Sequence, residues 1–386
     1  MVLRKNSEGR VAIVVSSINV RRLVPGLRSF ATGGRPFWLV DIYRPLDELK
    51  GLLDRWKPEA VLTEWLPGIT DTIISWGWPT VVAPGDVSLK GVGTVDVDDE
   101  AVGRLAAEHF VGNGLRNFAF FGTDTHYTNQ RLLGFREGLQ AVGMDEPEVQ
   151  WREMDQRRQY IEYWHESTDS LNDWLRGLPK PVGLFVAHDP LGRACAEACD
   201  VLGIRIPDEI AILGVNDDAL VCELTSPELS SVSIPWRQIG ERAGEMIEHF
   251  LSGEPFPEKP ILLPPGGIRR RRSSDFVAVE DPRIRRALQV MRDEVYSGIT
   301  VSEIARSASI PRRTLEHWFR NNLSMSPKEE LTRMRVGRSQ QLLLETDWSI
   351  ERIAETVGYS SAERFAVVFK QRVDSSPSMY RKRMRA

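Results

Sequence analysis

The C-terminal part of this 386-residue chain carries one pattern twice, and the repeat constrains the fold more than any other feature. Residues 303–320 recur as residues 352–370, with paired positions 49 or 50 residues apart. Each copy predicts a short helix with an apolar stripe, a tight turn and a second helix that ends in an aromatic residue and a base. This is the outline of a helix-turn-helix, whose second helix enters the major groove of DNA. Two copies reach successive groove turns, roughly 34 Å apart, so we expect a reader of double-stranded DNA.

The charge of the chain is divided unevenly along its length. Residues 281–386 contain 20 Lys+Arg and 13 Asp+Glu, a net charge of +7. The whole chain has 50 Lys+Arg and 54 Asp+Glu, which leaves 30 Lys+Arg and 41 Asp+Glu for residues 1–280, a net charge of −11. A basic end joined to an acidic body is expected when only one part of a protein meets DNA phosphates.

Before the repeat, short β-rich runs alternate with amphipathic helices, which indicates an α/β body with parallel sheets. The expected strands are residues 11–16, 37–42, 60–64, 80–83, 118–122, 182–187 and 210–215, and the expected helices include 100–111, 131–142 and 191–202. A body of this length is expected to form two lobes rather than one sheet. Ligands gather at the carboxyl ends of parallel strands, so a small-molecule site is predicted in the cleft between the lobes.

The composition argues against several other classes of protein. No apolar run approaches the ~20 residues that cross a bilayer, and the N-terminus lacks a signal-peptide pattern, so we expect a cytoplasmic protein with no membrane partner. Cys195 and Cys199 share a helix face, which suits either a packed helix interior or a metal or redox pair, and Cys222 stands apart. No P-loop, Ser/His/Asp constellation or metal motif stands out. Neither an enzyme, a cofactor nor a bound metal is therefore expected.

Six segments of the body resemble the LacI/GalR regulators and their periplasmic sugar-binding relatives. They are residues 93–98, 106–110, 131–135, 184–189, 206–217 and 229–234, and IPDEIAILGV at 206–215 is the most specific. In that family two Rossmann-like lobes close over a sugar or another small molecule. Those regulators carry their helix-turn-helix ahead of the body, whereas here it follows the body. A binding body followed by a double helix-turn-helix looks like the xylose-operon activator subgroup of the AraC/XylS family.

The resemblance implies an α/β body of the two-lobed periplasmic-binding-protein type, followed by an all-α domain with two helix-turn-helix motifs. We expect the body at residues 1–268, a linker at 269–280 and the DNA-binding domain at 281–386. The resemblance further implies a transcription activator that responds to a monosaccharide effector, a pentose such as xylose. It would bind tandem operator half-sites as a homodimer, with RNA polymerase as a partner. The same architecture also suits a different small-molecule effector.

Family positions place candidate ligand contacts in the body. Arg131 stands where the family has an arginine that hydrogen-bonds ligand hydroxyls, and a guanidinium suits a vicinal diol. A helix-start arginine paired with a carboxylate is the alternative. His188 and Asp189 stand where the family has a polar ligand-contacting pair, although Asp189 is equally suited to cap the helix that opens at Pro190.

Three further residues complete the candidate ligand site. Asn216 occupies a position where many relatives have an aspartate, so the charge-assisted part of recognition is lost there. Asp217 is expected to take over that role. Trp65 ends a strand and suits stacking on the apolar face of a pyranose, with core packing as the alternative. The departure at Asn216 leaves the identity of the effector open.

The expected linker begins with four arginines, residues 269–272. They suit either phosphate contacts beside a DNA-binding domain or ion pairs with the acidic body. We favour the second, because a related segment in the subgroup runs from the last strand into the linker.

Capping signals mark the helices of the repeated module. Asp281 precedes a proline, as an N-cap residue before the first helical position does. Thr300 with Glu303, and Ser326 with Glu329, have the spacing of a capping box. The long helix that begins after Ser326 is expected to hold the two motifs in a fixed register.

The first recognition helix is expected from residue 312 to about 321, with Leu315, Trp318 and Phe319 facing inward. Five side chains then face the groove or the phosphates: Arg312, Arg313, Glu316, His317 and Arg320. The two arginines at the helix start are the expected base readers, since arginine bidentate to guanine is the commonest specific contact.

In the second recognition helix Arg364 is the expected base reader, while Lys370 and Arg372 suit phosphate contacts. Glu363 stands at a family base-contact position but also has the spacing of a capping box with Ser360. We favour the capping role for Glu363.

Two other functions are disfavoured. A DNA-repair alkyl acceptor, some of which carry an AraC-like module, needs a metal-activated thiolate cluster, and three scattered cysteines do not supply one. A sugar-binding transport component does not agree with the missing signal peptide or with the attached DNA-binding module.

Overall fold

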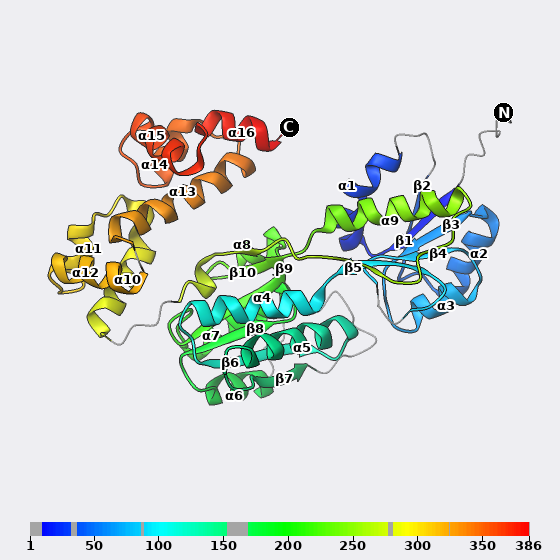
Figure 1. The fold of residues 1–386 in the computed structure, drawn as a ribbon, viewed down its shortest axis with the longest axis horizontal. Helices are drawn as coiled ribbons and strands as arrows, with labels where there is room; N and C mark the ends of the chain where they lie inside the picture. Colours follow the sequence, from blue (N-terminus) through cyan, green and yellow to red (C-terminus); the bar gives the residue numbers. More distant parts are fainter. Residues whose placement is uncertain are drawn as a thin grey trace. The chain divides into compact units, whose positions relative to one another are not determined.

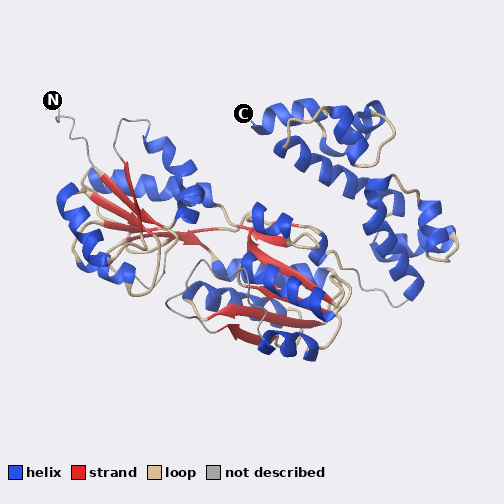
Figure 2. Ribbon diagram, turned by 180° about the vertical axis from the view of Figure 1, so that it is seen from behind, coloured by secondary structure: helices blue, strands red, loops and turns tan. Residues whose placement is uncertain are grey.

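The computed structural model describes residues 10–31, 37–85, 89–152, 169–276, 281–323 and 325–385. The chain divides into two compact units, Met1–Val277 and Ala278–Ala386. The first unit is an α/β body with two sheets, and the second consists of helices (Figure 1, Figure 2). No helix within the described ranges is long and apolar enough to cross a membrane.

The first lobe of the body is built on a six-stranded parallel sheet in the order β11-β5-β4-β3-β1-β2. Its strands are β1 (Val11–Val15), β2 (Phe37–Asp41), β3 (Ala60–Thr63), β4 (Thr80–Val82), β5 (Gly93–Val97) and β11 (Ile261–Leu263). The central strands β1 and β3 are buried along their whole length. Both faces of such a sheet are covered by helices, which is why these strands are unbroken apolar runs rather than alternating ones.

The second lobe has a sheet in the order β12-β10-β9-β8-β6-β7. Its strands are β6 (Asn117–Thr123), β7 (Glu148–Arg152), β8 (Val182–Val186), β9 (Ile210–Asn216), β10 (Ser230–Ser233) and β12 (Ile268–Arg269). The pairing of β10 with β12 is antiparallel, and the other pairs are parallel. The chain therefore passes between the two sheets three times, after β5, after β10 and after β11.

The helices of the body cover the two sheets (Figure 1). They are α1 (Ser17–Ala31), α2 (Leu46–Trp56), α3 (Ile69–Ser75), α4 (Asp99–Gly112), α5 (His126–Gln140), α6 (Asp169–Gly177), α7 (Asp189–Leu202), α8 (Ala219–Leu224), α9 (Trp236–Leu251) and the short 3₁₀ helix η1 (Arg272–Ser274). Two pairs cross on glycines: α1 packs on α9 at Gly26 and Gly240, and α4 packs on α5 at Gly103 and Gly134. A glycine at each crossing lets the two backbones approach closely.

The crossing of α4 and α5 makes a testable prediction. A Cβ atom at Gly103 would lie 2.1 Å from the carbonyl oxygen of Arg131, which belongs to a helix backbone and cannot rotate away. We expect Gly103→Ala to lower the free energy of unfolding by about 1–3 kcal/mol, the usual cost of overpacking. Gly112→Ala on the same helix is the control, because nothing lies within 4 Å of its Cβ atom. Urea unfolding measures both, and equal stability of the two variants would contradict a close crossing.

The strands expected from the sequence are all present, as β1, β2, β3, β4, β6, β8 and β9. Within the described ranges β5, β7, β10, β11 and β12 were not expected, because they are short or carry polar residues inside the run, such as Asp96 in β5. The helix expected from residue 131 begins at His126 instead. Arg131 therefore lies in the second turn of α5 and not at its start.

The second unit is helical throughout its described length, apart from turns. Its helices are α10 (Pro282–Glu294), the 3₁₀ helix η2 (Val295–Ser297), α11 (Val301–Ser307), α12 (Arg312–Leu323), α13 (Pro327–Glu345), α14 (Ile350–Thr356), α15 (Ala362–Val373) and α16 (Pro377–Arg385). The cap at Asp281 is confirmed, since its carboxylate accepts a hydrogen bond from the backbone N–H of Arg283 at 2.9 Å. The capping boxes that begin at Thr300 and Ser326 are confirmed as well.

The two copies of the repeat bury equivalent side chains. Each of the following residues has 0% of its surface exposed: Ile304 and Ile353, Leu315 and Phe365, and Phe319 and Phe369. The turn between the paired helices has positive φ at equivalent positions, 54° at Ser309 and 83° at Gly358. Helices α11 and α12, and again α14 and α15, thus form the two expected helix-turn-helix motifs.

Direct contacts join the two motifs, in addition to the connecting helix α13. Arg335 of α13 donates a hydrogen bond from Nε to the carbonyl oxygen of Val295 at 2.8 Å, and its guanidinium lies 5.8 Å from the ring centre of Tyr359. A Cβ atom at Gly358 would lie 2.9 Å from the backbone N of Gly298, so the two backbones are in close contact there. These contacts give the motifs a defined register.

Candidate ligand cavity and DNA-contacting surfaces

The body contains a cavity of about 230 Å³ at the carboxyl ends of strands from both of its sheets. Parallel α/β sheets hold their ligands at this position. The volume lies below the roughly 300–1,000 Å³ of pockets for drug-sized ligands, so it favours a small molecule. Both lobes contribute polar and aromatic side chains to the lining.

Glu64 lines the cavity on the side of the first lobe, at the end of β3. Its carboxylate accepts hydrogen bonds from the backbone N–H of Ser16 at 2.7 Å and from Nδ2 of Asn19. Burial raises the pKa of Glu64, although these hydrogen bonds oppose the shift. The contact orients the Asn19 amide, whose Oδ1 atom is buried and has no hydrogen-bond partner in the described part of the protein.

Arg131 of α5 pairs with the buried Asp99, and a second buried carboxyl group, that of Asp96, is influenced by the charges of both. Nε of Arg131 donates to Oδ1 of Asp99 at 2.7 Å, and Nη1 donates to the carbonyl oxygen of Ala187. Asp96 accepts a hydrogen bond from the backbone N–H of Gly85 at 3.0 Å. Burial, and then the charge of Asp99, raises the pKa of Asp96 well above its usual range. Arg131 therefore has a carboxylate partner, as one alternative expected, and also lines the cavity.

An ion pair crosses the cavity from one lobe to the other. Nη2 of Arg22, on α1, lies 3.1 Å from Oδ2 of Asp218, which is the N-cap residue of α8. The Arg22 guanidinium also lies 4.9 Å from the ring centre of Trp236. The Nε1–H group of Trp236 is buried and has no hydrogen-bond partner among the described residues. Two residues of the cavity lining, Asn19 and Trp236, thus each carry a buried polar atom that has no partner among the described residues.

Four of the six side chains expected to bind the ligand line this cavity: Trp65, Arg131, His188 and Asn216. The other two are engaged elsewhere. Asp189 is fully buried and accepts hydrogen bonds from Oγ of Ser231 at 2.6 Å and from the backbone N–H of Asp218 at 2.8 Å. Burial raises the pKa of Asp189 to about 7. The alternative role of Asp189 as a helix cap is wrong, because His188 is the N-cap residue of α7 and Asp189 is its first helical residue.

Asp217 is the second residue that the structure removes from the cavity lining. Its Oδ1 atom lies 2.7 Å from Nη2 of Arg271, and its Oδ2 atom lies 3.7 Å from Nη1 of Arg269. Asp218, the next residue, lines the cavity instead. The preference for ion pairs between the arginine run and the acidic body is confirmed for Arg269 and Arg271. Residues 269–276 of the expected linker therefore pack with the body.

Several residues of the cavity were missed by the sequence analysis. They are Ser16, Asn19, Arg22, Glu64, Asp96, Asp99, His126, Tyr127, Asp218 and Trp236. A usable signal existed for Ser16 and Glu64, because both end expected strands, where ligands gather. Trp236 follows β10, which is rich in serine and was not expected as a strand.

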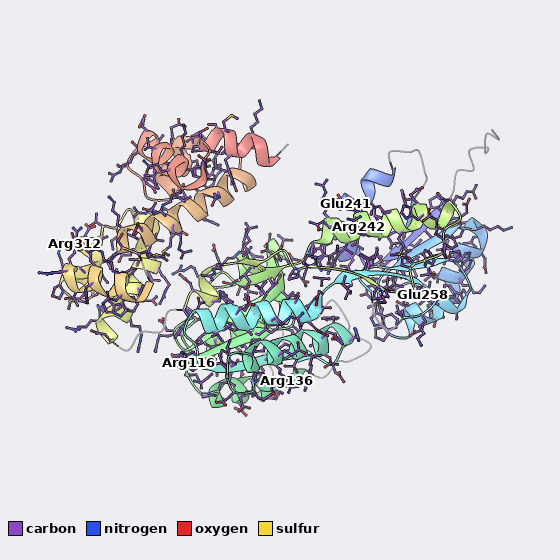
Figure 3. All side chains as sticks on the ribbon, in the orientation of Figure 1. Arg116, Arg136, Glu241, Arg242, Glu258 and Arg312 are labelled. Atoms are coloured by element: carbon purple, nitrogen blue, oxygen red, sulfur yellow. The ribbon has the colours of Figure 1, made fainter. Side chains whose placement is uncertain are left out.

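The polar face of the first recognition helix, α12, is exposed. The Arg312 side chain lies on α12 (Figure 3). It is 59% exposed, and its Nε atom lies 2.8 Å from Oε1 of Glu316. Arg313 and Arg320 are exposed, and so is His317. The ion pair with Glu316 occupies part of the Arg312 fork, whereas no hydrogen bond or ion pair of the Arg313 side chain occurs among the described residues. The Arg313 guanidinium thus has more unused donors than that of Arg312.

The second recognition helix, α15, also exposes its expected contacts, Arg364, Lys370 and Arg372. The expected capping box is wrong. The N-cap residue is Ser361, which accepts a hydrogen bond from the backbone N–H of Arg364, so Glu363 is the second helical residue and not the third. Hydrogen bonds from its own backbone and then from Ser361 lower the pKa of Glu363. Glu363 is exposed and keeps its charge beside Arg364.

The cysteines are buried. This holds for Cys195, Cys199 and Cys222, none of which forms a disulfide bond. Burial raises the pKa of the Cys199 thiol to about 12. The thiolate is the metal ligand and the nucleophile, so a thiol held in its protonated form suits the packed helix interior rather than a metal or redox pair.

Comparison with known proteins places both units. A family described as a periplasmic binding protein-like domain matches residues 107–274, and a helix-turn-helix domain family matches residues 285–383. The xylose operon regulatory protein of Escherichia coli strain K12 is 26% identical over 379 residues, which cover 94% of this chain and 93% of the relative. The protein of the same name from Haemophilus influenzae is 28% identical over 291 residues, which cover 74% of each chain.

Solved structures agree with this placement. The structure of the xylose-binding transcription activator xylR matches 97% of both chains with a TM-score of 0.69 and 24% identity. The transcriptional regulator CelR–cellobiose complex matches 70% of this chain and 86% of that chain with a TM-score of 0.56 and 22% identity. The relatives are transcription regulators and not enzymes. The chain is a XylR-like member of the AraC/XylS transcription regulators, in which a periplasmic-binding-protein-like body precedes a DNA-binding domain with two helix-turn-helix motifs.

Proposed function

We propose that this regulator is a cytoplasmic transcription activator whose effector is a monosaccharide held in the body cavity. The observation that carries the proposal is that two residues lining a cavity of about 230 Å³, Asn19 and Trp236, each carry a buried polar atom without a partner among the described residues. Buried polar groups are normally hydrogen-bonded, so their lack of partners points to a polar ligand. A pentose such as xylose agrees with the names of the relatives.

A sugar hydroxyl both donates and accepts, which matches what the cavity offers. Asn19 Oδ1 can accept, Trp236 Nε1–H can donate, and Nη2 of Arg131 has no hydrogen bond among the described residues. Trp65 offers an aromatic face for the apolar side of the ring. We infer that His188 and Asn216 add further polar contacts to the sugar. Asp189 and Asp217 do not line the cavity, and we infer that they hold the neighbouring loop in place.

We propose that the DNA-binding residues are those expected from the sequence: Arg312, Arg313, Glu316, His317, Arg320, Glu363, Arg364, Lys370 and Arg372. We also propose that a homodimer binds tandem half-sites, with two reading helices contributed by each chain. The effector shifts the equilibrium between lobe arrangements by its differential affinity for them, and so changes how the DNA-binding units engage the operator and RNA polymerase.

A monosaccharide screen on the full chain tests the effector. At a hundredfold excess over its Kd, a sugar that binds only the folded protein adds about 2.7 kcal/mol to the free energy of unfolding. We expect D-xylose to stabilise the protein and cellobiose to leave it unchanged. If another small molecule stabilises the protein instead, the proposal of a ligand-responsive regulator is retained and only the identity of the effector changes. Stabilisation by no monosaccharide would contradict the proposed effector class.

Calorimetry with one substitution places the sugar in the cavity. Trp236→Phe removes a single N–H donor and keeps the aromatic ring. Losing one hydrogen bond of about 0.5–1.5 kcal/mol raises the sugar Kd roughly 2- to 13-fold. Trp78→Phe is the matched control, because Trp78 packs in the separate cluster around α2 and α3. Equal Kd values for both variants would place the sugar elsewhere.

A further inference from the structure

Residues 216–218 link β9 to α8 and alternate between two environments. Asn216 and Asp218 line the cavity. Asp217, between them, instead binds Nη2 of Arg271 at 2.7 Å. Because the three residues are consecutive, a ligand that displaces Asn216 or Asp218 also displaces the carboxylate of Asp217.

This loop holds a backbone conformation that needs support. Asn216 and Asp217 have φ values of 114° and 53°, which residues other than glycine rarely adopt. The backbone N–H of Asp217 donates to Oγ of Ser231 at 2.9 Å, and that of Asp218 donates to Oδ2 of Asp189 at 2.8 Å. Such a conformation persists only while the surrounding contacts persist, so the loop is suited to respond when one of them changes.

Arg271 connects the loop to the end of the body. Its side chain is 1% exposed, and Nη1 donates to the carbonyl oxygen of Leu229 at 2.9 Å. Its backbone N–H donates to Oγ of Ser230 at 2.8 Å. In the sequence, the N-cap residue of the first helix of the DNA-binding unit, Asp281, follows shortly after it. Arg271 is therefore fixed both to the cavity loop and to the segment that leads to the DNA-binding unit.

A second anchor on the same segment does not reach the cavity. Oγ of Ser274 lies 2.8 Å from Nε2 of His109, and the carbonyl oxygen of Ser274 accepts from Nδ2 of Asn113 at 3.1 Å. His109 lies on α4 and Asn113 is the C-cap residue of that helix, and neither lines the cavity. Ser274 thus holds the segment against the body, whereas Arg271 contacts the loop that lines the cavity.

We propose that the Asp217–Arg271 ion pair couples occupancy of the cavity to the segment that leads to the DNA-binding unit. Arg271 is a positioning residue in this proposal, which rests on the proposed sugar-responsive function. A ligand that engages Asn216 or Asp218 moves Asp217. Arg271 follows, because separating two opposite charges that have little access to water costs free energy.

The test uses the full chain, D-xylose as the probe and a DNA fragment selected by the wild-type protein from a random pool. We measure the Kd for DNA with and without saturating D-xylose. The readout is the ratio of these two Kd values for DNA. Coupling between two sites is typically 5- to 150-fold, and we expect the ratio for the wild-type protein to lie in about this range. Arg271→Gln is expected to bind D-xylose and DNA but to show a ratio within about twofold of one. Asp217→Asn tests the same pair from the other side and is expected to lose the ratio as well.

Arg269→Gln is the matched control. Arg269 lies 3.7 Å from the other oxygen of Asp217 and has 35% of its side chain exposed, so its pair is expected to contribute little and the ratio to be retained. Because bound sugar itself stabilises the folded protein, urea unfolding with and without D-xylose is measured for every variant, and the ratio is compared only under conditions in which each protein is fully folded. A folded Arg271→Gln or Asp217→Asn protein with the wild-type ratio overturns the coupling. A wild-type protein whose DNA affinity does not respond to a bound monosaccharide overturns the proposed function instead.

Discussion

Replacing Arg131 by methionine is expected to abolish sugar binding and to lower the free energy of unfolding by about 3–5 kcal/mol. The Arg131 side chain is 7% exposed, and its Nε atom lies 2.7 Å from Asp99. Without the guanidinium the Asp99 carboxylate stays buried and loses its cation, which is the costly outcome for a buried pair. The cavity loses a hydrogen-bond donor at the same time.

A double variant separates these two roles of Arg131. Arg131→Met combined with Asp99→Asn removes the stranded charge, so most of the lost stability is expected to return. Sugar binding is expected to stay lost, because the donor is still missing. Urea unfolding and calorimetry with D-xylose measure the two quantities. Recovery of sugar binding in the double variant would mean that Arg131 is only the structural partner of Asp99.

The second large effect concerns DNA recognition. Arg313→Ala and Arg364→Ala are each expected to lower the preference for the selected site over unrelated DNA by about 1–3 kcal/mol, or roughly 5- to 150-fold. Both side chains are exposed on a recognition helix, near its N-terminal end. A bidentate arginine discriminates against the wrong base, so its loss weakens the specific complex and leaves the unspecific one nearly unchanged.

The control for DNA recognition is Lys370→Ala. Lys370 is exposed near the C-terminal end of α15, and a phosphate contact carries no sequence information. This variant is expected to weaken selected and shuffled sites alike and to reduce the salt slope of binding by about one. Fluorescence anisotropy at several salt concentrations measures all three variants. If Arg313→Ala and Arg364→Ala keep the wild-type site preference, the assigned reading faces are wrong.

The double helix-turn-helix was predictable because its determinants are local. The capping boxes at Thr300 and Ser326, and the buried positions of Phe319 and Phe369, depend on residues within one or two helical turns. The predicted capping box of Ser360 and Glu363 was wrong because the local sequence offers two possible N-cap residues. Two adjacent serines both have a capping side chain, and only the start of α15 at Ala362 selects Ser361.

The body was predictable only in part. Unbroken apolar runs such as β1 and β3 identified central strands, since such runs are typical of a sheet covered on both faces. The serine-rich strand β10 was not recognised, because its polar side chains are satisfied by distant partners. Ser230 donates to the carbonyl oxygen of Arg271, and Ser231 donates to Asp189.

The sequence by itself determined the types of element, the order of the two units and the resemblance to a family, since periodicity, capping and motif wording are all read along the chain. Only the tertiary structure decided which polar side chains meet in the cavity. Arg22 and Asp218 are 196 positions apart, and nothing near Arg22 distinguishes it from a surface arginine. Asp217 and Asp218 are neighbours of the same type, yet the backbone turn at 216–217 and the buried Arg271 direct one to the ion pair and the other to the cavity. Such pairings depend on how whole sheets and their connections pack, and that information is not local.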